Sequence, residues 1–168
     1  GEPRQVILAE KLVSYQFGKK YENYSDSAIP AEARQAGFAK AKQEYTLGDK
    51  KIPYQILASC KGVDLINIKY EQLLQYAQPF ENAQDAYRVI AGDFVTTEDG
   101  TGIVHTSPTF GADDALVAKQ AVPPIPPMLV LDENQNPVPL VTLQGKFRDE
   151  LPEVGGKYVK NEYFTAGE

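Results

Sequence analysis

The sequence has one cysteine, one histidine and no tryptophan. A lone cysteine cannot form a disulfide within the chain, so Cys60 indicates a reducing, intracellular compartment. Its flanks, ILASCKGVDL, are typical of a strand that runs into a turn. We therefore expect a buried or half-buried structural thiol rather than a nucleophile. One histidine and scattered carboxylates provide no ligand set at the spacing of a metal site.

Long apolar runs and an excess of basic residues are also missing. No stretch approaches the roughly 20 apolar residues that a membrane-spanning helix needs, and no signal peptide is visible. The chain has 17 Lys and Arg against 23 Asp and Glu, a net charge of −6. This balance argues against a generally basic surface for nucleic acid, although it is compatible with a local basic patch. We expect a cytoplasmic protein without a membrane partner.

The chain length and apolar content are those of an ordinary globular domain. With 168 residues and 42% hydrophobic residues, the chain is long enough to bury a core and too apolar to be disordered. We expect a single domain over residues 1–168. The first residue is Gly1 and the only methionine is Met128, which indicates a piece of a longer protein.

Residues 30–45 form the clearest predicted helix. They are rich in Ala, Glu, Lys and Gln, which are good helix formers, and Pro30 suits a first helical turn. The apolar face of this segment is thin, which predicts a surface helix. We also expect helical structure over residues 9–15 and 65–75, and a helix that starts after Asp113 and Asp114.

Short apolar segments bounded by Gly and Asp turns predict strands. Regular alternation of strand and helix is missing, so a doubly wound fold is not expected. The pattern predicts an α+β fold with a small, mainly antiparallel β-barrel or sheet and peripheral helices. The expected strands cover residues 6–8, 52–59, 86–91, 94–96, 103–106, 129–131 and 137–143.

The stretch from Gly92 to Gln120, GDFVTTEDGTGIVHTSPTFGADDALVAKQ, combines turns, a strand, polar groups and a helix start. His105 ends the predicted strand, where it either packs against its apolar neighbours or faces a pocket and exchanges a proton near neutral pH. Asp113 and Asp114 precede the helix, where aspartate commonly caps free backbone N–H groups. One carboxylate suffices as a cap, so the other is available to bind an ammonium group.

Two other chemistries fit this stretch poorly. A Ser107–His105–Asp114 triad would place the serine two residues from the histidine, without the glycines of a nucleophile elbow. The turn over residues 98–102 has two glycines but no lysine and no following helix, so it does not match a phosphate-binding loop.

Residues 93–114, DFVTTEDGTGIVHTSPTFGADD, resemble the signature of the editing domain inserted in isoleucyl-tRNA synthetases. Valyl and leucyl relatives share the Gly-Thr-Gly turn and the closing Asp, but they lack the His after the strand and the Phe-Gly that follows. Residues 62–80 and 145–159 are similar to flanking segments of the same domain. The resemblance therefore covers nearly the whole chain and favours the isoleucine enzyme.

The resemblance implies hydrolytic proofreading, in which a second pocket removes valine that has been esterified to the isoleucine tRNA. Discrimination of one methylene is worth only about 1–3 kcal/mol, so the synthetic site alone cannot reject valine. The resemblance implies that Asp114 holds the substrate ammonium and that His105 helps to place the ester and the terminal adenosine. The implied pocket walls are Thr106, Phe110, Gly111, Ala112 and Asp113.

The implied partners are the 3′ end of a tRNA that carries an amino acid and the rest of the synthetase chain, in a monomer. No metal or organic cofactor is expected in this domain, since ATP and Mg²⁺ act in the synthetase core. A Thr-rich peptide on the far wall of the pocket is not found in this sequence, so we expect weak hydrolysis by the fragment. The alternatives are a non-catalytic tRNA-docking or structural fragment, and the editing domain of a valyl or leucyl relative.

Overall fold

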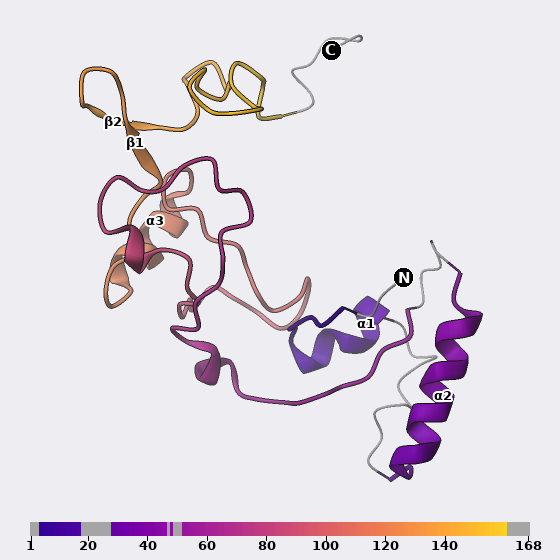
Figure 1. Ribbon diagram of the computed structural model, residues 1–168. Coiled ribbons are helices and arrows are strands. Elements are labelled where there is room, and N and C mark those ends of the chain that lie inside the picture. The colour runs from indigo at the N-terminus through magenta and orange to yellow at the C-terminus, as the bar shows by residue number, and fades with distance from the viewer. Residues whose placement is uncertain (1–3, 18–27, 47, 49–51, 161–168) are drawn as a thin grey trace. The chain divides into compact units, whose positions relative to one another are not determined.

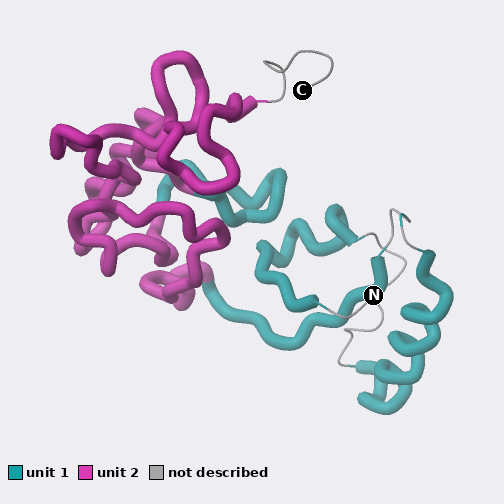
Figure 2. Tube along the Cα trace, turned by 45° about the horizontal axis from the view of Figure 1, so that its top comes forward, with its two compact units in different colours: residues 1–61, 92–105 teal, residues 62–91, 106–168 magenta. Residues whose placement is uncertain are grey.

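The computed structural model describes residues 4–17, 28–46, 48 and 52–160 (Figure 1). The chain divides into two compact units, each built from two separate stretches of sequence (Figure 2). Unit 1 contains residues 1–61 and 92–105, and unit 2 contains residues 62–91 and 106–168. The assignment of residues 1–168 to a single domain stays a prediction.

Unit 1 contains the helices predicted near the amino terminus. A 3₁₀ turn, Glu10–Leu12, leads into α1, Val13–Phe17, and α2 covers Ala31–Glu44 (Figure 1). Pro30 has an extended backbone and its carbonyl accepts a hydrogen bond from the Arg34 N–H at 3.0 Å. The only buried residue of α2 is Ala41. These observations confirm the predicted helices over residues 9–15 and 30–45.

The glycine turn of unit 1 lies against the amino-terminal segment. The Ala9 N–H donates to the Thr101 carbonyl at 2.8 Å, and Gln16 Nε2 donates to the Gly100 carbonyl at 2.5 Å. Gly100 and Gly102 have φ angles of 65° and 74°, in the left-handed region that glycine adopts readily. A Cβ on Gly102 would lie 2.5 Å from the Ala9 Cβ, so the close approach also requires glycine at this position.

A β-hairpin is the only regular sheet in the described part of the chain. Strands β1, Leu129–Leu131, and β2, Pro137–Pro139, are antiparallel, with Val130 opposite Val138 (Figure 1). Asp132 Oδ1 accepts hydrogen bonds from the Asn134 and Asn136 backbone N–H groups, both at 2.8 Å. The hydrogen bond from the Asn136 backbone lowers the pKa of the Asp132 carboxyl. Residues 132–136 therefore form the turn of this hairpin, between two segments that were predicted as strands.

The α+β class and the antiparallel sheet are confirmed, but the barrel prediction was wrong for the described residues. Extended segments form strands only where a neighbour pairs with their backbone groups. The predicted strand over residues 86–91 forms one isolated bridge, between Lys69 and Arg88. The predicted strand over 137–143 ends at Pro139. The other predicted segments that form no strand are residues 6–8, 52–59, 94–96 and 103–106.

Two further local predictions were wrong. The helix expected over residues 65–75 is replaced by a 3₁₀ turn, Gly62–Leu65, followed by irregular chain. Asn67 has a φ of 67°, a left-handed conformation that interrupts a right-handed helix. Cys60 is exposed rather than buried, because the irregular segment that precedes it forms no sheet that would cover the thiol.

Helix α3, Ala112–Gln120, belongs to unit 2 and buries Ala118. Ala118 is 0% exposed, and Arg88 is 7% exposed although it is charged. The Arg88 guanidinium donates to the Asp85 carbonyl and to Asn67 Oδ1, each at 3.4 Å, and also to the Pro123 carbonyl. Because Pro123 follows the end of α3, Arg88 connects this helix to two other loops of the unit.

We predict that Arg88→Met lowers the free energy of unfolding by about 1–3 kcal/mol, because hydrogen bonds to a buried charged donor are lost. Lys119→Met is the matched control, since Lys119 is an exposed cation on α3 and its loss should cost less than about 0.5 kcal/mol. Denaturant unfolding of both variants measures the difference. Equal stability of the two variants would contradict a structural role for Arg88.

Candidate functional site

Helix α3 begins without a side-chain cap. Its N-cap residue, Gly111, has an extended backbone with φ −134° and ψ 134°. The Ala115 N–H donates to the Gly111 carbonyl at 2.8 Å. Asp113 and Asp114 occupy the first turn, where negative charge complements the partial positive charge of the helix N-terminus. The prediction that one aspartate caps the helix was wrong, because the N-cap position is occupied by a glycine.

Asp114 instead fixes the loop that precedes the helix. Its Oδ2 atom accepts a hydrogen bond from the Ser107 backbone N–H at 2.9 Å, and the carboxylate is partly buried. In the described part of the chain, Oδ1 has no hydrogen-bond partner. The neighbouring Asp113 is exposed. One carboxylate oxygen of Asp114 therefore holds the loop, while the other is available to a cationic ligand.

Residues 107–110 form a turn that is held at several points, called here the 107–110 turn. The Phe110 N–H donates to the Ser107 carbonyl at 3.1 Å and closes the turn. The Thr109 hydroxyl accepts from the Met128 N–H at 2.9 Å and lies 3.4 Å from the Met128 carbonyl. Ser107 and Thr109 were not predicted as supporting residues, and the only signal for them in the sequence is the Ser-Pro-Thr turn itself.

Gly111 lies directly against the Asp114 carboxylate. A Cβ on Gly111 would lie 3.0 Å from Asp114 Cγ and from Asp114 Oδ2. This distance is shorter than an ordinary van der Waals contact, so a side chain here would push the carboxylate away from its present position. The absence of a side chain at Gly111 thus contributes to the orientation of Asp114.

The structure brings together most of the residues predicted for the site. Six of them occupy the 107–110 turn, the residue before it and the first turn of α3, all in unit 2. They are Thr106, Phe110, Gly111, Ala112, Asp113 and Asp114. His105 is exposed and is the last residue of the second stretch of unit 1. The inclusion of His105 in the site stays a prediction.

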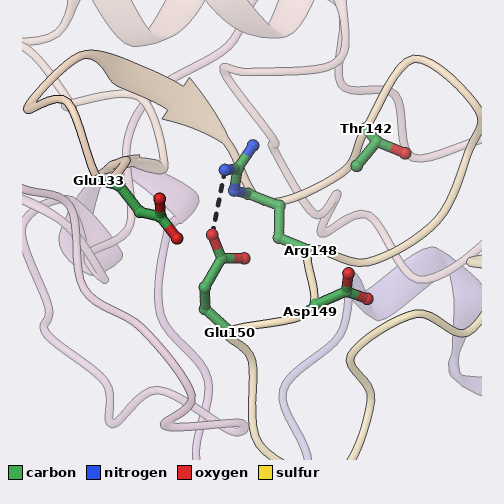
Figure 3. Close-up of a pocket in the computed structure, with 5 residues that line it drawn as sticks. All are labelled: Glu133, Thr142, Arg148, Asp149 and Glu150. Carbon is green, nitrogen blue, oxygen red and sulfur yellow. Dashed lines mark hydrogen bonds and ion pairs between the residues drawn. The ribbon is translucent and has the colours of Figure 1, made fainter.

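A separate cleft of about 390 Å³ lies on unit 2 (Figure 3). Its lining residues are Glu133, Thr142, Arg148, Asp149 and Glu150. Arg148 and Glu150 point toward one another, and Arg148 Nη2 lies 3.1 Å from Glu150 Oε1 (Figure 3). A backbone N–H hydrogen bond and the Arg148 guanidinium lower the pKa of the Glu150 carboxyl. The mixed charges of Arg148, Asp149 and Glu150 are typical of a solvated surface, and none of the lining residues was predicted as functional.

The described ranges contain neither a candidate metal site nor a candidate membrane span. No group of three or more His, Cys, Asp or Glu side chains there could hold a metal ion. Equally, no helix among those residues is long and apolar enough to cross a membrane.

Comparison with known proteins points to one enzyme family. The isoleucine–tRNA ligase of Cytophaga hutchinsonii is 48% identical over 164 residues, which are 98% of this chain and 13% of the relative. The isoleucine–tRNA ligase of Bacteroides fragilis is 41% identical over 97% of this chain and 14% of its own length. That of Clostridium tetani is 42% identical over 64% of this chain and 9% of its own length. No family model matches the chain.

We predict that Gly111→Ala displaces the Asp114 carboxylate and weakens its hydrogen bond to the Ser107 N–H. The added methyl group is expected to cost about 1 kcal/mol of stability, at the lower end for overpacking because the carboxylate is only partly buried. Faster hydrogen exchange of the Ser107 amide, observed by NMR, measures the displacement. Gly62→Ala is the control, because its Cβ would meet no atom within 4 Å. Unchanged exchange at Ser107 would contradict the close contact.

Proposed function

Since the chain is homologous to a segment of the isoleucine–tRNA ligases, we propose that it is the proofreading domain of such a ligase. The proposed reaction is hydrolysis of valine that has been esterified to the isoleucine tRNA. The chain spans only 13% of the length of the Cytophaga hutchinsonii ligase and 14% of that of the Bacteroides fragilis ligase. The activity and partners of a whole ligase are therefore part of this proposal. The relatives described are all isoleucine–tRNA ligases, which favours this specificity over the valyl or leucyl alternative.

The geometry of Asp114 is the observation that carries the proposal. Its Oδ2 atom is held by the Ser107 N–H, and its Oδ1 atom is without a partner in the described residues. A partly buried carboxylate of this kind can bind an ammonium group through charge-assisted hydrogen bonds. The α-ammonium of an esterified amino acid is such a group, and binding it would place the adjacent ester carbonyl within the same site.

The proposed chemistry requires water and an oriented ester. Water adds to the ester carbonyl carbon, and the bond between this carbon and the ribose oxygen breaks. The ribose oxygen takes a proton, and valine leaves as the free amino acid. In this proposal Asp114 positions the ester, His105 contributes to placing the ester and the terminal adenosine, and Thr106 and Gly111 shape the walls. The reaction uses no organic cofactor or metal, and the partner is the 3′ end of the charged tRNA.

A non-catalytic function is the second candidate, and one observation favours it. The hydrogen bond from the Ser107 N–H to Asp114 is a structural contact that would explain this residue without any substrate. In that case the segment would dock tRNA or support the remainder of a ligase chain, and Asp114 would act only on the loop. The two candidates differ in whether the charge of Asp114 is needed or only its acceptor oxygen.

Asp114→Asn separates these candidates, because the amide oxygen can still accept from the Ser107 N–H while the negative charge is lost. In the full-length ligase that carries this segment, we expect the rate of valine release from valyl-tRNA to fall roughly 10- to 100-fold. This corresponds to the loss of a charged hydrogen bond worth about 1.5–3 kcal/mol. The measurement is deacylation of valyl-tRNA under single-turnover conditions.

Glu71→Gln provides the control, since it removes the same charge from an exposed residue of unit 2 that lies outside the site. We expect it to change deacylation less than about 3-fold, as for an exposed charge. Wild-type deacylation by Asp114→Asn, with an unchanged unfolding midpoint, would assign Asp114 a purely structural role and support the non-catalytic candidate.

A further inference from the structure

Phe110 combines an exposed ring with a fixed backbone. Its side chain is 59% exposed, although phenylalanine is a large apolar residue. Its own N–H closes the 107–110 turn, and the preceding residue, Thr109, is hydrogen-bonded to the Met128 backbone. The following residue, Gly111, is the N-cap of α3. The ring is thus presented to solvent from a backbone that is held on both sides.

We propose that Phe110 is a stacking platform for the terminal base of the RNA, an inference that rests on the proposed function. An aromatic side chain stacks on any base, because every base has a π-face. Phenylalanine has only two rotatable side-chain bonds, and its backbone is already ordered here. Stacking therefore costs little conformational entropy, which makes Phe110 suited to recognising a flexible RNA end.

The charges beside Phe110 favour a base over a phosphate as its partner. Asp113 and Asp114, in the first turn of α3, are both carboxylates. Two carboxylates repel a phosphodiester and attract an ammonium group. A charged tRNA end carries the ammonium of the amino acid and a neutral aromatic base on the same nucleotide. Asp114 holds the first of these and Phe110 holds the second.

One hydrogen-bonded unit supports both contacts. Ser107 donates its N–H to Asp114 and offers its carbonyl to the Phe110 N–H. The backbone of Phe110 and the carboxylate of Asp114 are therefore both hydrogen-bonded to the same residue. This arrangement selects a ligand whose ammonium and base are joined by a short link, as in an aminoacyl ester of a terminal nucleoside.

The test measures deacylation by the full-length ligase with two valyl-tRNA substrates. One has the normal terminal adenosine, and the other has an abasic nucleotide at that position. For the normal substrate, Phe110→Leu should raise KM about 10-fold with little change in kcat, because stacking binds ground state and transition state alike. Phe110→Tyr should retain the wild-type KM, because the aromatic face is kept.

The abasic substrate shows whether the base is the group that Phe110 contacts. Wild type should have a KM about 10-fold higher for this substrate, and Phe110→Leu should add no further increase. Phe80→Leu is the matched control, since Phe80 is 40% exposed on the same unit, and it should leave both KM values unchanged. Unfolding midpoints of all variants should equal that of wild type.

Three results would overturn the inference. If Phe110→Leu has the same KM as the wild type on the normal substrate, the ring makes no stacking contact with the base and only lines the pocket. An equal rise in KM on both substrates would assign Phe110 to the amino acid rather than the base.

If wild type releases no valine, the proposed hydrolysis fails. The base contact is then measured separately by the affinity of uncharged tRNA with a normal or abasic end. Equal affinities for these two RNAs would reject the stacking contact.

Discussion

The hydrogen bond from the Ser107 backbone N–H to the Asp114 carboxylate, 2.9 Å long, determines the geometry of the candidate site. It joins the start of the 107–110 turn to the first turn of α3, so the backbone between them has little freedom. The lack of a side chain at Gly111 leaves the space that this carboxylate occupies. Each group that we assign to the substrate therefore depends on a contact within the protein, which is how a binding geometry is preorganised.

The opposite end of α3 is fixed by a different kind of interaction. Arg88 is buried, and its guanidinium is bonded to backbone carbonyls and an amide oxygen rather than to a carboxylate. A planar group with five N–H donors can satisfy several loop acceptors at once, which a single apolar side chain cannot do. Few apolar side chains are buried in the described part of unit 2. Hydrogen bonds of this kind therefore contribute much of what holds the loops around α3 in place.

Local features of the structure were predictable from the sequence, and features that need a distant partner were not. The helix over residues 30–45 and the turn over 132–136 depend on composition and on side chains within a few residues. The predicted strands over residues 52–59 and 103–106 had suitable composition, but a strand also needs a paired neighbour, which composition does not specify. The same limit explains the wrong prediction for Cys60, whose exposure depends on what covers it.

The candidate site shows the same division. The 93–114 signature identified Asp114 and Phe110, and a helix start was expected after the two aspartates. The sequence could not predict that Asp114 bonds to a backbone N–H of the preceding loop rather than capping its own helix, because both arrangements use the same residues. The hydrogen bond from the Met128 N–H to the Thr109 hydroxyl was equally unpredictable from the sequence, since it joins a backbone to a side chain 19 residues away.

The contacts of the glycine turn in unit 1 also constrain the order in which the chain can acquire its structure. Gln16 bonds to Gly100 across 84 residues of sequence, and Ala9 lies against Gly102. During synthesis, the amino-terminal segment leaves the ribosome long before these partners exist. The closure of so long a loop carries an entropic cost that local helices do not have. The contacts of residues 9–16 can thus be completed only after residues 100–102 have been made.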